Sequence, residues 1–311
     1  MRSPAQSVAG APTYHTTRAS IGGGTPADAG APSSHRRWGR RLLRRAQVLP
    51  HFPARPAPGE RGRWRIGPPR VISRRLIGAL LGQARTRFTP YYLRSEDGGR
   101  IGTLSTQPPG EERSTTYVYD PEDPCPTIAG SHSFLRDIPG LIQAGSVDQR
   151  ANESREDVLV FSTPPLEADT EVTGPIVLHL HAASTARDTD FTVKLLDVHP
   201  DGAAYNLTEG IVRARFRESI YEPPKLLTPG EVYRYRIELL PTANVFRAGH
   251  RIRIHVSSSN WPLWDRNPNT GNAQGMDAEL RRAVQTIHHD AARPSHLMLP
   301  IVPRDAASRI S

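Results

Sequence analysis

The chain has too few cysteines for a disulfide-stabilised protein and no apolar run long enough for a membrane-spanning helix. Its 311 residues include one cysteine, Cys125, so neither an intrachain disulfide nor a cysteine-based metal site can form. No apolar run approaches the ~20 residues that a helix needs to cross a bilayer. The first 30 residues also lack the apolar stretch of a secretory signal. We therefore expect a cytoplasmic protein with no membrane partner and no cofactor.

Acidic residues and lysine are almost absent from the front of the chain. Residues 1–89 hold 17 arginines, no lysine and two acids, Asp28 and Glu60, so their net charge is 17 − 2 = +15. Because the whole chain carries +9, residues 90–311 carry 9 − 15 = −6. A basic arm of this kind could bind nucleic acid or an anionic membrane. Arginine without lysine, beside abundant alanine, glycine and proline, is more typical of codon bias in a solvated tail, and we do not predict a nucleic-acid partner.

Large apolar side chains are also scarce near the start. Residues 1–35 cannot bury enough surface to offset the entropy of ordering, and six prolines between residues 50 and 69 block helix and sheet. We therefore predict a disordered arm over residues 1–85. Residues 86–157 are punctuated by prolines and glycines, which favours an irregular, extended connector. Residues 304–311 are expected to form a short tail.

Alternating apolar and polar residues dominate the region from 158 to 303. Period-2 alternation with turn residues between the runs predicts about nine short strands, and charges on one side of each strand are typical of a two-layer sheet. The predicted fold is an all-β, jelly-roll β-sandwich of the galactose-binding-like type. Residues 276–287 could alternatively form a helix. The alternating runs are 158–162, 176–181, 191–198, 203–207, 211–216, 233–239, 251–256, 281–288 and 296–302.

Several blocks in this region resemble one family of hydrolases. The blocks are DVLVFSTPPLEADTEVTGPI, DTDFTVKLLDVHPDG, YNLTEGIVRARFRES, PGEVYRYRIELLPTANVFRAGHRIRIHVSSSNWP and DRNPNTG, preceded by TPYYLRS, PPGEE, YVYDPEDPCPT and DQR. Together they resemble the C-terminal domain of the cocaine-esterase-like (CocE/NonD) and X-Pro dipeptidyl-peptidase-like serine hydrolases, over residues 86–303. The resemblance implies a jelly-roll β-sandwich that packs against a catalytic α/β-hydrolase domain.

The catalytic machinery of such hydrolases has no counterpart in the sequence. It requires a Ser–His–Asp triad with the serine in a G-x-S-x-G turn, and no such string occurs. The nearest, GSHSF at 130–134, lacks the second glycine. We assign no catalytic residue and predict a domain that is inactive alone and works with an α/β-hydrolase domain in trans, or self-associates. A truncation, a degenerate remnant and an out-of-frame start all remain open for the arm.

One loop provides the candidate substrate-binding residues. The string SSSNWPLW follows a strong strand, and its Trp261 and Trp264 could wall an acyl pocket with Asn260 as a polar anchor. The same tryptophans could instead cap the sandwich or pack against another domain. They also allow a different function, a stand-alone binding module for carbohydrate or another polymer.

Histidines suggest a metal site that we reject. His179 and His181 lie on one face of a predicted strand, as in cupin-type sites, and His255 could be a third ligand. However, no carboxylate follows at residues 182–186, and the apolar residues between these histidines fit the core face, so we interpret His179 and His181 as a surface pair. His288, His289 and Asp290 have the residue types of a triad, but without a nucleophile we interpret them as a strand end and turn.

Overall fold

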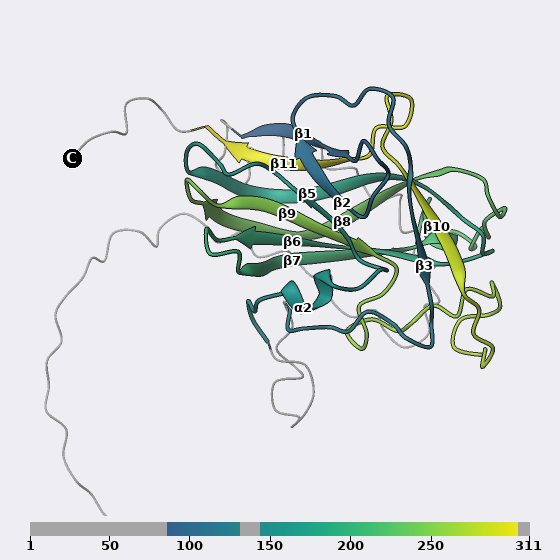
Figure 1. The fold of residues 1–311 in the computed structure, drawn as a ribbon. Coiled ribbons are helices and arrows are strands. Elements are labelled where there is room, and N and C mark those ends of the chain that lie inside the picture. Colours follow the sequence, from purple (N-terminus) through teal and green to yellow (C-terminus); the bar gives the residue numbers. More distant parts are fainter. Residues whose placement is uncertain (1–85, 131–143, 304–311) are drawn as a thin grey trace, which may run out of the picture. The chain divides into compact units, whose positions relative to one another are not determined.

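A β-sandwich makes up the part of the chain that the structure describes, which is residues 86–130 and 144–303 of a computed structural model (Figure 1). The predictions for residues 1–85 and 304–311, and for most of the GSHSF string, lie outside this part. One short helix, α2 (Arg150–Glu153), and one 3₁₀ turn, η1 (Ala214–Phe216), accompany the strands. The strands are β1 (Arg87–Arg94), β2 (Ile101–Ser105), β3 (Thr115–Tyr119), β4 (Leu159–Ser162), β5 (Thr170–Ser184), β6 (Asp190–Val198), β7 (Ala204–Arg213), β8 (Tyr233–Phe246), β9 (Arg251–Ser257), β10 (Ala283–His288) and β11 (His296–Val302).

The strands form two layers that one short strand joins. β5 is the centre of the first layer, where β8 pairs with one edge, and β11 and β10 pair with the other. The second layer is β4–β9–β6–β7, and its strands β9, β6 and β7 run side by side in Figure 1. β2 links the layers because it pairs antiparallel with β1 and parallel with β4.

The core lies between the layers and follows the alternation of the sequence. In β5, Ile176, Leu178 and Leu180 are fully buried, and Ile252 and Ile254 of β9 face them from the other layer in the same cluster. Burying an aliphatic side chain of this size contributes about 1.5–3 kcal/mol, so this cluster is the main source of stability. The prediction of an all-β sandwich is confirmed.

The region predicted to be an irregular connector is part of the sheet. β1 pairs with β11 on one side and with β2 on the other, and Leu93, Leu104 and Tyr119 are buried in the core. The sequence pattern did not reveal these strands, because their apolar runs are short and interrupted by proline. Pro90 is tolerated in β1 because β2 pairs only from Tyr92 onward, so Pro90 has a strand neighbour on one side alone.

Two further segments differ from the alternatives considered. Residues 283–288 form strand β10 between β3 and β5, so the helix over 276–287 does not form. The runs at 203–207 and 211–216 merge into β7 followed by η1. Gly210 makes this continuous strand possible, because an added Cβ there would lie 2.3 Å from the Glu238 carbonyl oxygen of β8.

Candidate functional site

The tryptophan loop begins where β9 ends and lies against the segment around Cys125. The Trp261 amide donates to the Cys125 carbonyl oxygen at 2.9 Å, and the Thr127 amide donates to the Trp261 carbonyl oxygen at 2.6 Å. The Trp261 side chain is 43% exposed, with the Arg266 guanidinium 6.0 Å from its ring centroid. Two backbone hydrogen bonds therefore hold an exposed aromatic ring at the surface.

The three candidate residues of this loop lie in different environments. Asn260 is buried, and neither side-chain polar atom has a hydrogen-bond partner among the described residues, so it does not reach the surface as an anchor would. Trp264 lines a groove of about 460 Å³ that Asn260 and Trp261 do not line. We call it the Trp264 groove; its other apolar lining residues are Ile211, Leu239, Leu240, Pro241 and Leu263. Substrate binding by these residues stays a prediction.

A buried polar network holds the next part of this loop to the end of the sandwich. Asp188 accepts hydrogen bonds from Arg215 Nε at 2.7 Å and Asn267 Nδ2 at 2.9 Å. Asp190 accepts from Arg213 Nε and Nη2, both at 2.9 Å, and from Asn267 Nδ2 at 2.8 Å. The sequence blocks DTDF, VRARFR and DRNPNTG, which are far apart in the chain, meet here.

Burial controls the electrostatics of this network. It raises the pKa of Asp190 to about 6, against the opposing effect of the Arg213 guanidinium. Burial lowers the pKa of Arg213, but its hydrogen bonds and charge attraction to Asp190 and Asp265 together outweigh burial, so that pKa is raised. Arg213 also reaches Asp265 at 3.2 Å, which leaves the pair connected to the surface. All these groups are satisfied by one another, so the network positions the loop and offers no free base.

A hydroxyl–imidazole–carboxylate chain is present, but it is sealed inside the protein. His289 Nε2 lies 3.0 Å from Thr115 Oγ1, and His289 Nδ1 lies 3.4 Å from Glu112 Oε2. All three side chains are buried, and burial lowers the pKa of His289. The Thr115 hydroxyl donates a hydrogen bond to the Gly99 carbonyl oxygen at 3.2 Å. A substrate cannot reach this hydroxyl. The contacts among Thr115, His289 and Glu112 therefore hold the 95–115 segment in place rather than catalysing a reaction. Sequence reasoning missed it because Thr115 and His289 are 174 residues apart.

The histidine pair of β5 is more enclosed than predicted. His179 is 9% exposed, because His296 of β11 and Arg234 of β8 flank it. The ring centroids of His179 and His296 are 5.0 Å apart. Burial lowers the pKa of half-buried His181. Interpretation as a plain surface pair was therefore wrong for His179, since the alternation of β5 does not reveal what its neighbours place beside it.

The third histidine considered, His255, belongs to the other layer. It is buried, and its Nε2 lies 2.9 Å from Glu153 Oε1 of α2. Arg253 also binds this carboxylate, at 2.7 Å. Both side chains lie on the face of β9 opposite the apolar row, and α2 contacts that face. His255 already has a carboxylate partner and does not join the β5 pair.

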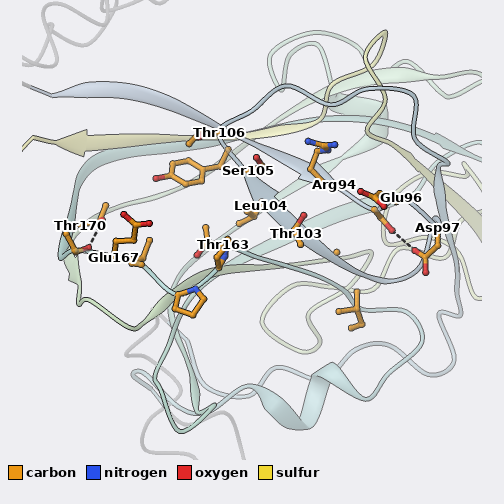
Figure 2. Close-up of a pocket in the computed structure, with 18 residues that line it drawn as sticks. Arg94, Glu96, Asp97, Thr103, Leu104, Ser105, Thr106, Thr163, Glu167 and Thr170 are labelled. Atoms are coloured by element: carbon orange, nitrogen blue, oxygen red, sulfur yellow. Dashed lines mark hydrogen bonds between the residues drawn. The ribbon is translucent and has the colours of Figure 1, made fainter.

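A large groove lies between β1–β2 and the 163–170 segment (Figure 2). Its volume is about 930 Å³, and Tyr91, Leu104 and Leu166 give it an apolar floor. Figure 2 shows Glu167 toward one end and Arg94 toward the other. The described lining contains hydroxyls and carboxylates but no histidine, lysine or cysteine, and its Ser95 hydroxyl donates to Asp97 Oδ1 at 3.2 Å. Nothing in the sequence pattern marks this groove.

The described part of the chain contains no helix long and apolar enough to cross a membrane.

The sequence matches the X-Pro dipeptidyl-peptidase C-terminal non-catalytic domain over residues 79–298. The chain belongs to this family. The resemblance drawn from the sequence blocks over 86–303 is thereby confirmed.

Relatives of this C-terminal non-catalytic domain are esterases. The chain is 45% identical over 227 residues to a cocaine esterase of Rhodococcus sp. (strain MB1 Bresler), covering 70% of this chain and 38% of the relative. It is 35% identical over 253 residues to a putative serine esterase of Mycobacterium bovis, covering 64% of this chain and 39% of the relative. The chain thus spans less than two fifths of these curated relatives.

Solved structures agree on the fold. An aminopeptidase from a marine sediment Thaumarchaeota archaeon aligns with a TM-score of 0.63 and 32% identity, over 70% of this chain and 37% of that one. An α-amino acid ester hydrolase aligns with a TM-score of 0.61 and 32% identity, over 69% of this chain and 36% of that one. In both, the C-terminal non-catalytic domain matches a minor part of a longer chain.

Proposed function

We propose that this domain supports the α/β-hydrolase domain of a serine hydrolase that cleaves esters or amides, and that it has no hydrolytic activity alone. The observation that carries the proposal is the family match to a non-catalytic domain over residues 79–298. The relatives named as esterases support the hydrolase class. The sealed Thr115–His289–Glu112 chain supports the lack of independent activity, because no substrate can reach its hydroxyl.

We propose the Trp264 groove as the surface that contacts the catalytic domain. Leu240 on its rim is 56% exposed, and Trp264 is half-buried beside it. Apolar side chains gathered on one surface favour a protein contact over solvent. The catalytic domain is supplied in the same polypeptide or in trans. Without it, the exposed apolar surface favours self-association of this chain.

The activity test uses the purified full chain with aryl esters, X-Pro amides and a fluorophosphonate probe. We expect turnover at the buffer rate and no labelled serine, whereas a serine esterase run in parallel is labelled. Covalent labelling of any serine in this chain would show that it carries its own nucleophile and would end the proposal.

The contact test uses the separately produced α/β-hydrolase domain of the Rhodococcus cocaine esterase, chosen because that relative is 45% identical to this chain. We expect a complex in light scattering and a slower thermal inactivation of the esterase activity. A double change of Leu240→Ser and Trp264→Ser should abolish both effects. Val118→Ser is the matched control, since Val118 is 51% exposed on β3. A chain that stays monomeric and forms no complex would contradict the proposal.

We further propose that the protein works in the reducing cytoplasm. Its one thiol, Cys125, is buried and unpaired, and burial raises its pKa to about 11, which keeps the thiol protonated. Cell fractionation tests the location, and recovery of the chain outside the cytoplasmic fraction would contradict it.

A further inference from the structure

Two turns at one end of the second layer bring together two imidazoles and a carboxylate. Asp197 lies near the end of β6, His199 lies in the β6–β7 turn, and His250 lies in the β8–β9 turn. One ligand-type atom of each residue lies within 4.8 Å of the others. None of these residues belongs to the sites described above.

The separations are close to those that a metal ion requires. His250 Nδ1 lies 2.9 Å from Asp197 Oδ1, and His199 Nε2 lies 4.0 Å from Asp197 Oδ2. The two imidazole ring centroids are 4.4 Å apart. In a tetrahedral zinc site with bonds of about 2.0–2.1 Å, ligand atoms are about 3.3 Å apart. His250 contacts Oδ1 whereas His199 approaches Oδ2, so the first separation must open by a few tenths of an ångström and His199 must rotate toward the carboxylate before one zinc ion can bind all three residues.

The backbone holds both turns in place, so only a side-chain adjustment is needed. The His199 amide donates to the Ala203 carbonyl oxygen at 2.8 Å, and the His250 amide donates to the Arg247 carbonyl oxygen at 3.0 Å. Asp197 is directly opposite Ile252 across the β6–β9 ladder, which fixes the distance between the turns. The His199 side chain is 41% exposed and can rotate toward the carboxylate.

We propose that Asp197, His199 and His250 bind a Zn²⁺ ion. Two neutral imidazole nitrogens and one carboxylate oxygen are ligands that zinc accepts, whereas Ca²⁺ and Mg²⁺ prefer oxygen atoms alone. Zinc takes the place of the hydrogen bond between His250 Nδ1 and Asp197 Oδ1, and the single proton of the neutral His250 ring then resides on Nε2. The exposed side of His199 leaves the fourth position open to water. Bound zinc clamps the β6–β7 turn to the β8–β9 turn.

The test measures Zn²⁺ binding to the full chain after treatment with a chelator, in competition with a chromophoric zinc indicator. We expect about one equivalent of Zn²⁺ at this site and an affinity at least tenfold lower in His199→Ala. His199→Ala carries the test because its exposed side chain contributes little to folding, whereas His250 is hydrogen-bonded to Asp197. Excess Zn²⁺ should raise the Tm of the wild type but not of His199→Ala.

The matched control is His181→Ala, which removes a half-buried histidine from the other layer. This variant should keep the wild-type zinc affinity and the wild-type rise in Tm. Equal zinc affinity in the wild type and His199→Ala would overturn the proposal, and so would loss of binding in His181→Ala with binding retained in His199→Ala. This result does not depend on the contact with a catalytic domain.

Discussion

Asn267 connects the two acidic residues of the buried network, and its replacement tests how the loop is held. The side chain is 1% exposed. Its amide nitrogen donates one proton to Asp188 Oδ2 at 2.9 Å and the other to Asp190 Oδ1 at 2.8 Å. Its amide oxygen accepts from the Asn269 backbone at 2.9 Å. Asn267→Asp keeps the shape of the side chain, removes both donors and adds a third carboxylate.

The expected loss follows from those two hydrogen bonds. Hydrogen bonds to charged groups contribute about 1.5–3 kcal/mol each, so losing two costs about 3–6 kcal/mol before any repulsion. A domain is stable by only about 5–15 kcal/mol, so Asn267→Asp should be severely destabilised. The pKa of the introduced carboxyl is raised by burial and by its acidic neighbours, so the cost is present at high pH and shrinks as pH falls through that pKa.

Urea unfolding of the full chain, followed by tryptophan fluorescence, measures this loss at pH 7.5 and pH 5.5. The matched control is Asn272→Asp, because Asn272 is exposed and donates one hydrogen bond, at 3.1 Å to Asp277. We expect the control to cost less than about 1 kcal/mol. If Asn267→Asp cost no more than the control, or if its cost grew at the lower pH, our account of the network would be refuted.

Three more predictions concern stability. Gly210→Ala should cost about 1–3 kcal/mol in urea unfolding, because the added Cβ meets the Glu238 backbone, whereas Gly110→Ala should cost little, since no atom lies within 4 Å of its Cβ; equal costs would contradict this. Burial raises the pKa of Asp190 from 3.8 to about 6, so its contribution to stability is full below 3.8 and is lost as pH rises through 6. The stability of the wild type relative to Asp190→Asn should therefore fall by about 1 kcal/mol from pH 5 to pH 7.5, and a rise would contradict the direction. Trp261→Ala should change the unfolding free energy by less than about 1 kcal/mol, since the ring is 43% exposed; a larger loss would mean that it caps the core.

The structure also explains which sequence predictions succeeded. Alternation in β5 and β9 correctly predicted the buried rows, because a strand points successive side chains to opposite faces and one face must bury apolar groups. The same alternation placed His255 and Arg253 on the opposite face but did not reveal their partner there. Period 2 separates the two faces of a strand, but it does not show that α2 lies over the second face.

The sequence by itself determined the β class, the inward rows of the core, the family and the division between a basic arm and an acidic body. These depend on local periodicity, composition and ordered blocks of residues. Only the tertiary structure decided that β1 completes a layer, that Thr115 meets His289 and that His199 meets His250. Each of these contacts joins distant segments, and their geometry depends on strand register and on the turns that the paired strands hold in place.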